Sequence, residues 1–161
     1  MKKYHVFETV NHNSVPHGTK LLDYTWAMKK KSSGTYRARL ALRGFKQVEG
    51  QHYKKNNTSS PVITDIAIRV VLALIILSIS WVGRITDVQG SFLHGSFQRP
   101  SKRIYTKVPQ GLRHLYPPHT ILLLLITMYG SIQGALQWWR DINQGMTFLQ
   151  WNMSTCNPCL H

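Results

Sequence analysis

The residues best suited to do chemistry in this chain lie around Asp87, near the middle of the sequence. Asp87 is one of 6 acidic residues in a chain that contains 20 Lys and Arg. It stands in a short β-prone segment, residues 85–88, and is followed by Gly90 and the aromatic Phe92. A carboxylate in this position can hold Mg²⁺, and small neighbouring residues let a nucleotide approach the backbone, as in metal-dependent phosphoryl transfer. A lone Asp near a Gly is also common as a turn or cap residue, so the rest of the chain must decide between these interpretations.

The composition favours a folded domain with an anionic partner. At 161 residues the chain has the length of one domain or of part of a larger one, and its 43% hydrophobic content is enough to bury a core. The formal net charge is +14 at pH 7. Phosphate backbones are the commonest partners of so basic a chain. The alternative is a fragment that lacks its acidic part.

The sequence shows no clear targeting segment and no clear metal-ligand cluster. Met1 opens a polar stretch that lacks the apolar centre of a signal peptide. The longest apolar run, residues 70–79, has about ten residues, whereas a helix that spans a bilayer needs about twenty. Cys156 and Cys159 form one Cys-x-x-Cys with no second pair, so a four-ligand zinc site is not expected. We therefore expect an intracellular protein without a membrane partner, and the sequence leaves its oligomeric state open.

Two neighbouring segments predict a basic hairpin that could position such chemistry. Residues 22–29 and residues 36–43 both alternate between apolar and polar side chains, which is typical of half-buried strands. The polar loop between them contains a glycine, so we expect an antiparallel hairpin with Arg37, Arg39 and Arg43 on one face of its second strand. Guanidinium groups bind phosphate in a bidentate manner, so this face could close over a triphosphate or grip a template. The alternative is an ordinary solvated strand face.

Helices and further short strands are expected around this hairpin. Residues 64–80 form the longest helix candidate, with Thr64 or Asp65 as its N-cap. This helix is apolar nearly all round, and such helices are usually buried. The other expected elements are a short strand over 104–111, a buried strand or helix start over 121–126, a helix over 131–148 and a loose polar lead-in over 1–17.

Several of these segments resemble the motifs of copia-type reverse transcriptases, in the same order along the chain. Residues 36–45, Tyr-Arg-Ala-Arg-Leu-Ala-Leu-Arg-Gly-Phe, resemble the family's Tyr-Lys-Ala-Arg-Leu-Val-Ala-Arg-Gly-Phe. Residues 87–95, Asp-Val-Gln-Gly-Ser-Phe-Leu-His-Gly, resemble its first catalytic motif, Asp-Val-Lys-Thr-Ala-Phe-Leu-Asn/His-Gly. Further matches are Ser-Pro-Val at 60–62, Ile-Tyr at 104–105, Tyr-Gly at 129–130 and Pro-Cys-Leu at 158–160. The resemblance covers about residues 18–161.

The resemblance implies an α+β fold, namely an incomplete polymerase fingers-and-palm with an antiparallel sheet and packed helices. Within a domain over residues 18–161, residues 20–62 would form the fingers hairpin and residues 63–161 a partial palm. The helix over residues 64–80 would pack beneath the palm sheet. The implied activity is RNA-directed DNA synthesis by part of a retrotransposon Pol polyprotein. Its implied partners are an RNA template, a DNA primer and deoxynucleoside triphosphates, with Mg²⁺ as cofactor.

The resemblance also implies roles for individual residues. Asp87 would be the catalytic carboxylate that holds the metal. Phe92 would be the aromatic gate against a ribose 2′-hydroxyl, and Gln133 would lie near the template base. The candidates for contacting phosphate of the incoming nucleotide or template are Arg37, Arg39 and Arg43.

The chain departs from the family at the remaining metal ligands. Two catalytic metal ions need at least two carboxylates, which the family supplies as an adjacent Asp-Asp pair. The aspartates of this sequence are Asp23, Asp65, Asp87 and Asp141, and none are neighbours. We therefore expect a truncated and inactive reverse transcriptase domain. The alternatives are a non-catalytic basic nucleic-acid-binding module and a decayed open reading frame without function.

Overall fold

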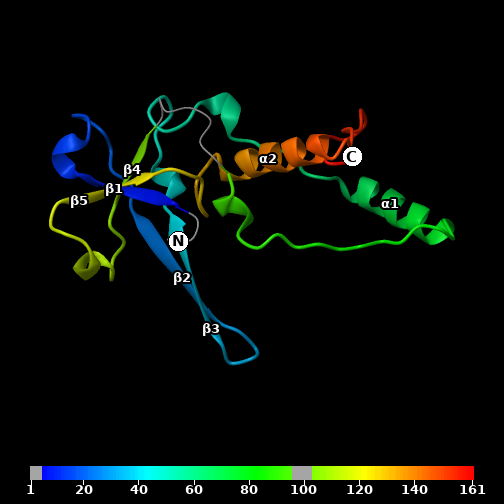
Figure 1. Cartoon of the computed structure of the whole chain (residues 1–161), viewed down its shortest axis with the longest axis horizontal. Helices are drawn as coiled ribbons and strands as arrows, with labels where there is room; N and C mark the ends of the chain where they lie inside the picture. Colours follow the sequence, from blue (N-terminus) through cyan, green and yellow to red (C-terminus); the bar gives the residue numbers. More distant parts are fainter. Residues whose placement is uncertain (1–4, 96–102) are drawn as a thin grey trace.

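The structure, a computed structural model, combines antiparallel strands with helices and describes residues 5–95 and 103–161 (Figure 1). This arrangement agrees with the expected α+β class. The strands and α-helices of the described residues are β1 (Phe7–Asn11), β2 (Tyr24–Lys30), β3 (Tyr36–Leu42), α1 (Asp65–Leu77), β4 (Ile104–Lys107), β5 (Thr120–Leu124) and α2 (Gly134–Phe148).

The core forms around a three-stranded antiparallel sheet in the order β1-β5-β4, against which Leu22, Leu40, Leu42 and Met128 pack. The central strand β5 settles the open choice over residues 121–126 in favour of a strand. Its side chains alternate between two buried clusters, with Ile121 and Leu123 beside Tyr105 and with Leu124 beside Leu22. A strand covered on both faces needs an uninterrupted apolar run, which explains why its sequence shows no period of two.

The expectation of a loose lead-in over residues 1–17 is wrong for residues 7–11. Residues 7–11 form β1, which pairs with β5 from Phe7 opposite Leu124 to Asn11 opposite Thr120. The short sequence Phe-Glu-Thr-Val-Asn is too polar to indicate a strand by itself. Its pairing depends on the apolar strand more than 100 residues later, which no local pattern reveals.

The predicted hairpin is confirmed as β2 and β3, paired from Tyr24 opposite Leu42 to Lys30 opposite Tyr36. The expectation that its strands are half-buried is wrong for most of β2 and for the first half of β3, which are exposed. In Figure 1 the hairpin projects away from the three-stranded sheet. Leu22, expected at the start of the hairpin, pairs with the other sheet instead. Its amide donates to the Tyr105 carbonyl at 3.0 Å, and its carbonyl accepts from the Lys107 amide at 2.8 Å. Leu22 therefore anchors the hairpin on β4.

A second link between the hairpin and the sheet runs through Tyr24. Its hydroxyl lies 2.7 Å from Thr106 Oγ1, and this threonine in turn donates to the Leu122 carbonyl at 3.1 Å. Burial raises the pKa of Tyr24 to about 12, an effect that the contact with Thr106 partly offsets. The buried phenol therefore stays neutral even at alkaline pH, where an exposed tyrosine would ionise.

The backbone at the end of β3 lies directly against the turn that leads into α2. The Leu42 amide donates to the Tyr129 carbonyl at 2.7 Å. A Cβ added at Gly130 would collide with the Leu42 carbonyl, and one at Gly44 would collide with the Gly130 carbonyl. Gly130 also has a φ of +84°, which side-chain-bearing residues rarely adopt. Only glycine fits at this crossing.

Helix α1 forms where expected, but the expectation that it is buried is wrong. Thr64 is its N-cap, with its hydroxyl accepting from the Ala67 amide at 3.3 Å. None of its residues is buried, and Ile66 and Ile76 are 75% and 81% exposed. Figure 1 shows α1 at the far end of the molecule from the sheet. The apolar side chains of α1 would be more stable if another part of the protein packed against them, but the described residues leave most of them exposed.

Helix α2 confirms the helix expected over residues 131–148, with a start three residues later. The preceding residues form turns, in which Ser131 and Gly134 donate their amides to the carbonyls of Met128 and Ser131. Gly134, Leu136 and Gln137 form the buried face of α2. Within the described ranges, no helix is long and apolar enough to cross a membrane.

The crossing at Gly130 gives a direct test of this fold. Gly130→Ala is expected to destabilise the protein by about 3 kcal/mol or more, because it adds a backbone clash to the strain of a positive φ. Gly111→Ala is the matched control, since Gly111 has a φ of +88° but open space around its Cα. It should cost about 1 kcal/mol. Urea unfolding followed by tryptophan fluorescence measures both, and equal losses would contradict the close crossing.

Candidate nucleic-acid interface

The exposed basic face of the hairpin is built by the register of β2 and β3. Arg37 lies directly opposite Lys29, and Arg39 lies opposite Ala27, so the three cations share one face. All three residues are exposed. Like charges directly opposite each other repel and weaken a strand pair. The register therefore places this repulsion on an exposed face of the hairpin, where an anion could reach the cations.

Arg39 also connects the basic face to the turn before α2. Its guanidinium lies 5.4 Å from the centre of the Tyr129 ring, within the range of a cation–π contact. The ring of Phe92 meets the same tyrosine edge-on at 5.2 Å. Tyr129 therefore brings two predicted site residues, Arg39 and Phe92, to one place. Sequence reasoning did not assign Tyr129 a role, although the Tyr-Gly match at 129–130 marked its position.

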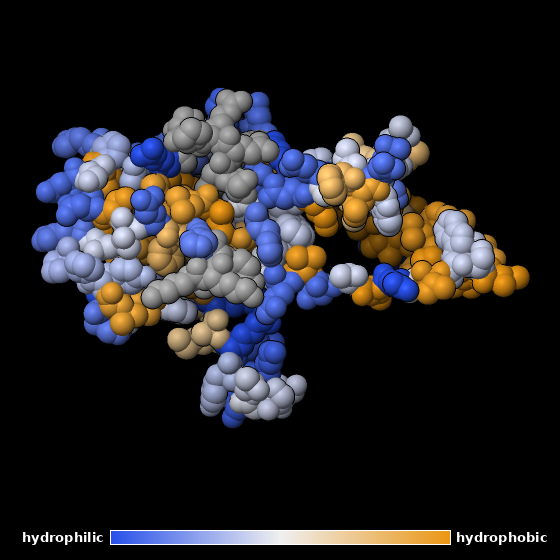
Figure 2. Space-filling view, in the orientation of Figure 1, coloured by the Kyte–Doolittle hydropathy of each residue, from blue (hydrophilic) through white to orange (hydrophobic). Residues whose placement is uncertain are grey.

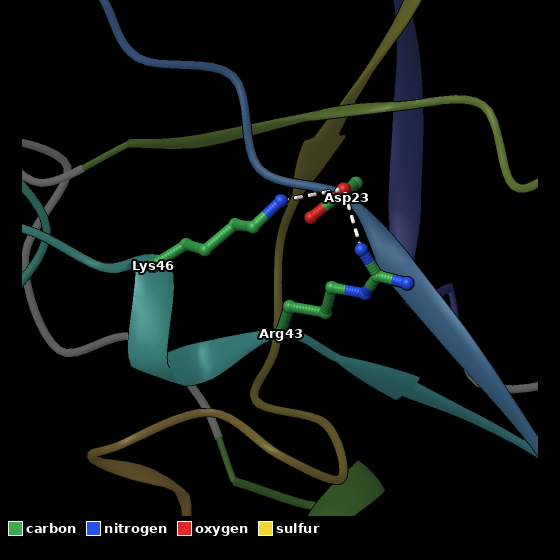
Figure 3. Close-up of polar contacts among 3 residues, drawn as sticks. All are labelled: Asp23, Arg43 and Lys46. Carbon is green, nitrogen blue, oxygen red and sulfur yellow. Dashed lines mark hydrogen bonds and ion pairs between the residues drawn. The ribbon is translucent and has the colours of Figure 1, made fainter.

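Arg43 lies just beyond β3 and forms an ion pair with Asp23 at the base of the hairpin (Figure 3). Its Nη1 lies 3.3 Å from Asp23 Oδ2, and Lys46 Nζ lies 2.9 Å from the same oxygen. The Arg43 amide also donates to the Asp23 carbonyl at 3.0 Å. Arg43 thus differs from Arg37 and Arg39, because a carboxylate of the chain already neutralises part of its charge.

The environment of Asp23 favours its charged form. The hydrogen bond from Lys46 is the main reason that the pKa of Asp23 lies below its usual 3.8, and the charges of Lys46 and Arg43 act in the same direction. Burial opposes this shift. Sequence reasoning missed Lys46, which follows the strand after a turn and belongs to no periodic pattern.

Asp87 lies on an exposed, irregular segment between α1 and the short 3₁₀ helix Ser91–Leu93. The β-prone segment expected over residues 85–88 does not form a strand. Among the described residues, no hydrogen bond or ion pair is found for the Asp87 side chain, and no group of three or more His, Cys, Asp or Glu could hold a metal ion. The described carboxylates therefore do not fit a two-metal clamp.

Gln133 is engaged with the loop that follows β3. Its Oε1 accepts from Gln47 Nε2 at 3.0 Å, and its Nε2 donates to the His52 carbonyl at 3.3 Å. Gln47 also accepts from the Ile132 amide at 2.8 Å. These contacts hold residues 47–52 against the start of α2. In this structure Gln133 supports the loop, and its amide is available to a base only if those bonds are exchanged.

Comparison of the chain with known proteins finds one matching family and a curated relative. A family model described as "Reverse transcriptase (RNA-dependent DNA polymerase)" matches residues 4–161. The retrovirus-related Pol polyprotein from transposon TNT 1-94 of Nicotiana tabacum is 28% identical over 152 residues. That match includes 91% of this chain but only 11% of the polyprotein. No solved structure matches the chain.

The ion-pair cluster at Asp23 predicts a specific pH dependence of stability. A lowered folded-state pKa means that ionised Asp23 stabilises the fold above pH 3.8, and this contribution is lost as the pH falls through the folded pKa. Asp23→Asn should therefore lower the urea midpoint at about pH 6, and the difference from the unchanged protein should shrink towards about pH 3. Asp87→Asn, which removes an exposed carboxylate, should have little effect at either pH. A constant difference for Asp23→Asn would contradict the assignment.

Proposed function

This chain belongs to the reverse transcriptase (RNA-dependent DNA polymerase) family, and on that premise we propose that its hairpin grips the phosphate backbone of a template–primer. The observation that carries the proposal is the exposed cationic face of Lys29, Arg37 and Arg39 on a projecting hairpin. In a chain of net charge +14, this face offers guanidinium groups at fixed strand spacing, which suits bidentate phosphate contacts.

The remaining site residues receive roles that rest on the family resemblance. Asp87 would hold a divalent metal ion, and Phe92 would stand beside the sugar of an incoming nucleotide. Arg43 would contact phosphate only after leaving Asp23, so we assign it a weaker part than Arg37 and Arg39. Gln133 would approach the template base after exchanging its bonds to the 47–52 loop.

Nucleotide addition by this chain alone is not part of the proposal. Reverse transcriptases generally use divalent metal ions, and two such ions need at least two carboxylates. The described residues offer Asp87 without a neighbouring acidic partner. We therefore propose that the chain binds nucleic acid without extending a primer. A reverse transcriptase activity would belong to a larger assembly, since this chain corresponds to 11% of the tobacco polyprotein.

Binding to a labelled RNA–DNA hybrid over a range of salt concentrations tests the main proposal. Changing both Arg37 and Arg39 to Ala should weaken binding about tenfold and reduce the slope of log K against log salt by about two, because two phosphate contacts are lost. The matched control changes Arg84 and Arg113, which are exposed outside the hairpin, and so removes the same charge. Equal losses in both variants would show diffuse attraction and contradict a hairpin site.

Primer extension with Mg²⁺ tests the proposal that this chain alone adds no nucleotides. The unchanged chain and Asp87→Asn should both give no product above a no-enzyme control, because a single carboxylate cannot clamp two metal ions. Extension by the unchanged chain that Asp87→Asn abolishes would overturn this part. The hybrid-binding result would stand independently of it.

A further inference from the structure

Arg37 and Arg39 share the basic face of the hairpin but differ in their surroundings. Both residues are exposed, and the strand register places them on the same face. Figure 2 shows hydrophilic side chains along much of the projecting hairpin. Among the described residues, the Arg37 guanidinium has no ionic, hydrogen-bonded or aromatic partner, whereas that of Arg39 lies over the Tyr129 ring. The two arginines therefore form a matched pair that differs by one aromatic contact.

Tyr129 belongs to a closely packed turn, so its ring is a fixed neighbour for Arg39. The Tyr129 carbonyl accepts the Leu42 amide at 2.7 Å, and a Cβ at the next residue, Gly130, would collide with the Leu42 carbonyl. The preceding residue, Met128, is 1% exposed. A tyrosine side chain has two rotatable angles, whereas an arginine has a long flexible stem. The contact therefore restricts the arginine more than the tyrosine.

Phe92 gives the Tyr129 ring a second neighbour that is itself held in place. The two rings meet edge-on, with their centres 5.2 Å apart and an angle of 64° between their planes. The Phe92 carbonyl accepts the hydroxyl of the buried Thr127 at 2.8 Å, which fastens it to the same turn. The Tyr129 ring thus lies between a packed aromatic residue and the mobile end of an exposed cation.

The contact with Tyr129 leaves Arg39 able to bind phosphate. A cation–π contact uses the charge of the guanidinium and none of its N–H donors. Among the described residues, no acceptor takes a hydrogen bond from the Arg39 side chain, so its donors remain available. A long side chain that is already confined loses less freedom when it binds a ligand. Arg39 is therefore better prepared for a phosphate contact than Arg37.

We propose that Tyr129 is a positioning residue, which orients Arg39 so that its guanidinium meets a phosphate of the template–primer beside the turn before α2. This role rests on the proposed function, because it specifies how the hairpin holds one of its phosphates. Arg37 contributes its charge without such guidance. Binding of nucleic acid should accordingly depend more on Arg39 than on Arg37, although the two residues carry the same charge.

Binding of a labelled RNA–DNA hybrid to single and double variants tests the positioning role. Arg39→Ala should weaken binding about fivefold and Arg37→Ala about twofold. Tyr129→Leu, which removes the ring, should weaken binding about threefold in the unchanged chain and in Arg37→Ala, because it removes one cation–π contact. It should have no further effect in Arg39→Ala. Tyr129→Phe, which keeps the ring, should bind within about twofold of the unchanged chain.

Tyr36→Leu is the matched control, because Tyr36 forms the same kind of contact with Lys30 at 5.5 Å on the other face of the hairpin. It should leave binding within about twofold of the unchanged chain. Equal weakening by Tyr36→Leu and Tyr129→Leu would overturn the positioning role, because it indicates that exposed rings stack on bases. Equal weakening by Tyr129→Leu with and without Arg39 would also overturn it, because the ring would then act independently of the arginine.

The failure of the positioning role can be told apart from the failure of the proposed function. If Arg39→Ala binds as tightly as the unchanged chain, both are overturned. If Arg39→Ala weakens binding and a folded Tyr129→Leu does not, only the positioning role is overturned. Near-ultraviolet circular dichroism of the tryptophans shows whether each variant keeps its fold.

Nuclear magnetic resonance of the unchanged chain tests the contact without nucleic acid and without a change at Tyr129. Protons that lie over an aromatic ring are shifted upfield by its ring current. The Nε–H signal of Arg39, assigned by its loss in Arg39→Ala, should therefore lie upfield of the Arg37 signal. Equal shifts for the two arginines would show that the ring does not hold Arg39 and would overturn the proposal.

Discussion

The anchoring of the hairpin at Leu22 is the constraint on which the rest of the structure depends. Leu22 is fully buried, and both of its backbone groups bond to β4. The next residue, Asp23, forms ion pairs with Arg43 and Lys46. The residue after it, Tyr24, forms a hydrogen bond with the Thr106 hydroxyl. Leu22 and Tyr24 thus join the two sheets by backbone and hydroxyl contacts, and Asp23 between them ties the start of the hairpin to its end. Because the joint is fixed, the tip of the hairpin can project and still present its cations in a defined direction.

The same joint separates a cation that is ion-paired within the fold from cations that are exposed on the hairpin. Arg43 lies close to the joint, where Asp23 neutralises part of its charge and ties it into the fold. Arg37 and Arg39 lie further along β3, beside Lys29 and without a carboxylate opposite them. Charge near the joint therefore serves stability, whereas charge further out repels its neighbours, and the proposed contact with phosphate would relieve that repulsion. Tyr129 links the base of the hairpin to its outer part. Its ring contacts Arg39, and its carbonyl accepts a hydrogen bond from the Leu42 amide.

Local patterns predicted the pairing of the hairpin correctly, because both strands alternate between apolar and polar residues and lie next to each other in the sequence. They also placed α1, α2 and β4 close to their observed positions. They failed for β1, whose pairing depends on β5 across most of the chain, and they left β5 undecided because a strand buried on both faces has no period. The burial of α1 was predicted from composition, which indicates that cover is needed but not what provides it. For the candidate site, register placed Arg37 and Arg39, whereas the Asp23–Lys46 contact and the role of Tyr129 arise from tertiary packing.

Hydrogen exchange read by mass spectrometry tests most directly whether the chain builds a stable core that carries an accessible basic hairpin. We expect the slowest exchange in β5 and in residues 40–42 of β3, where the two sheets and the crossing at Gly130 meet. The hairpin tip around residues 31–35 should exchange faster and become protected when an RNA–DNA hybrid is added. Uniformly fast exchange would show that the core does not close and that the motifs are those of a decayed sequence. A stable core whose hairpin gains no protection would contradict the proposed binding role.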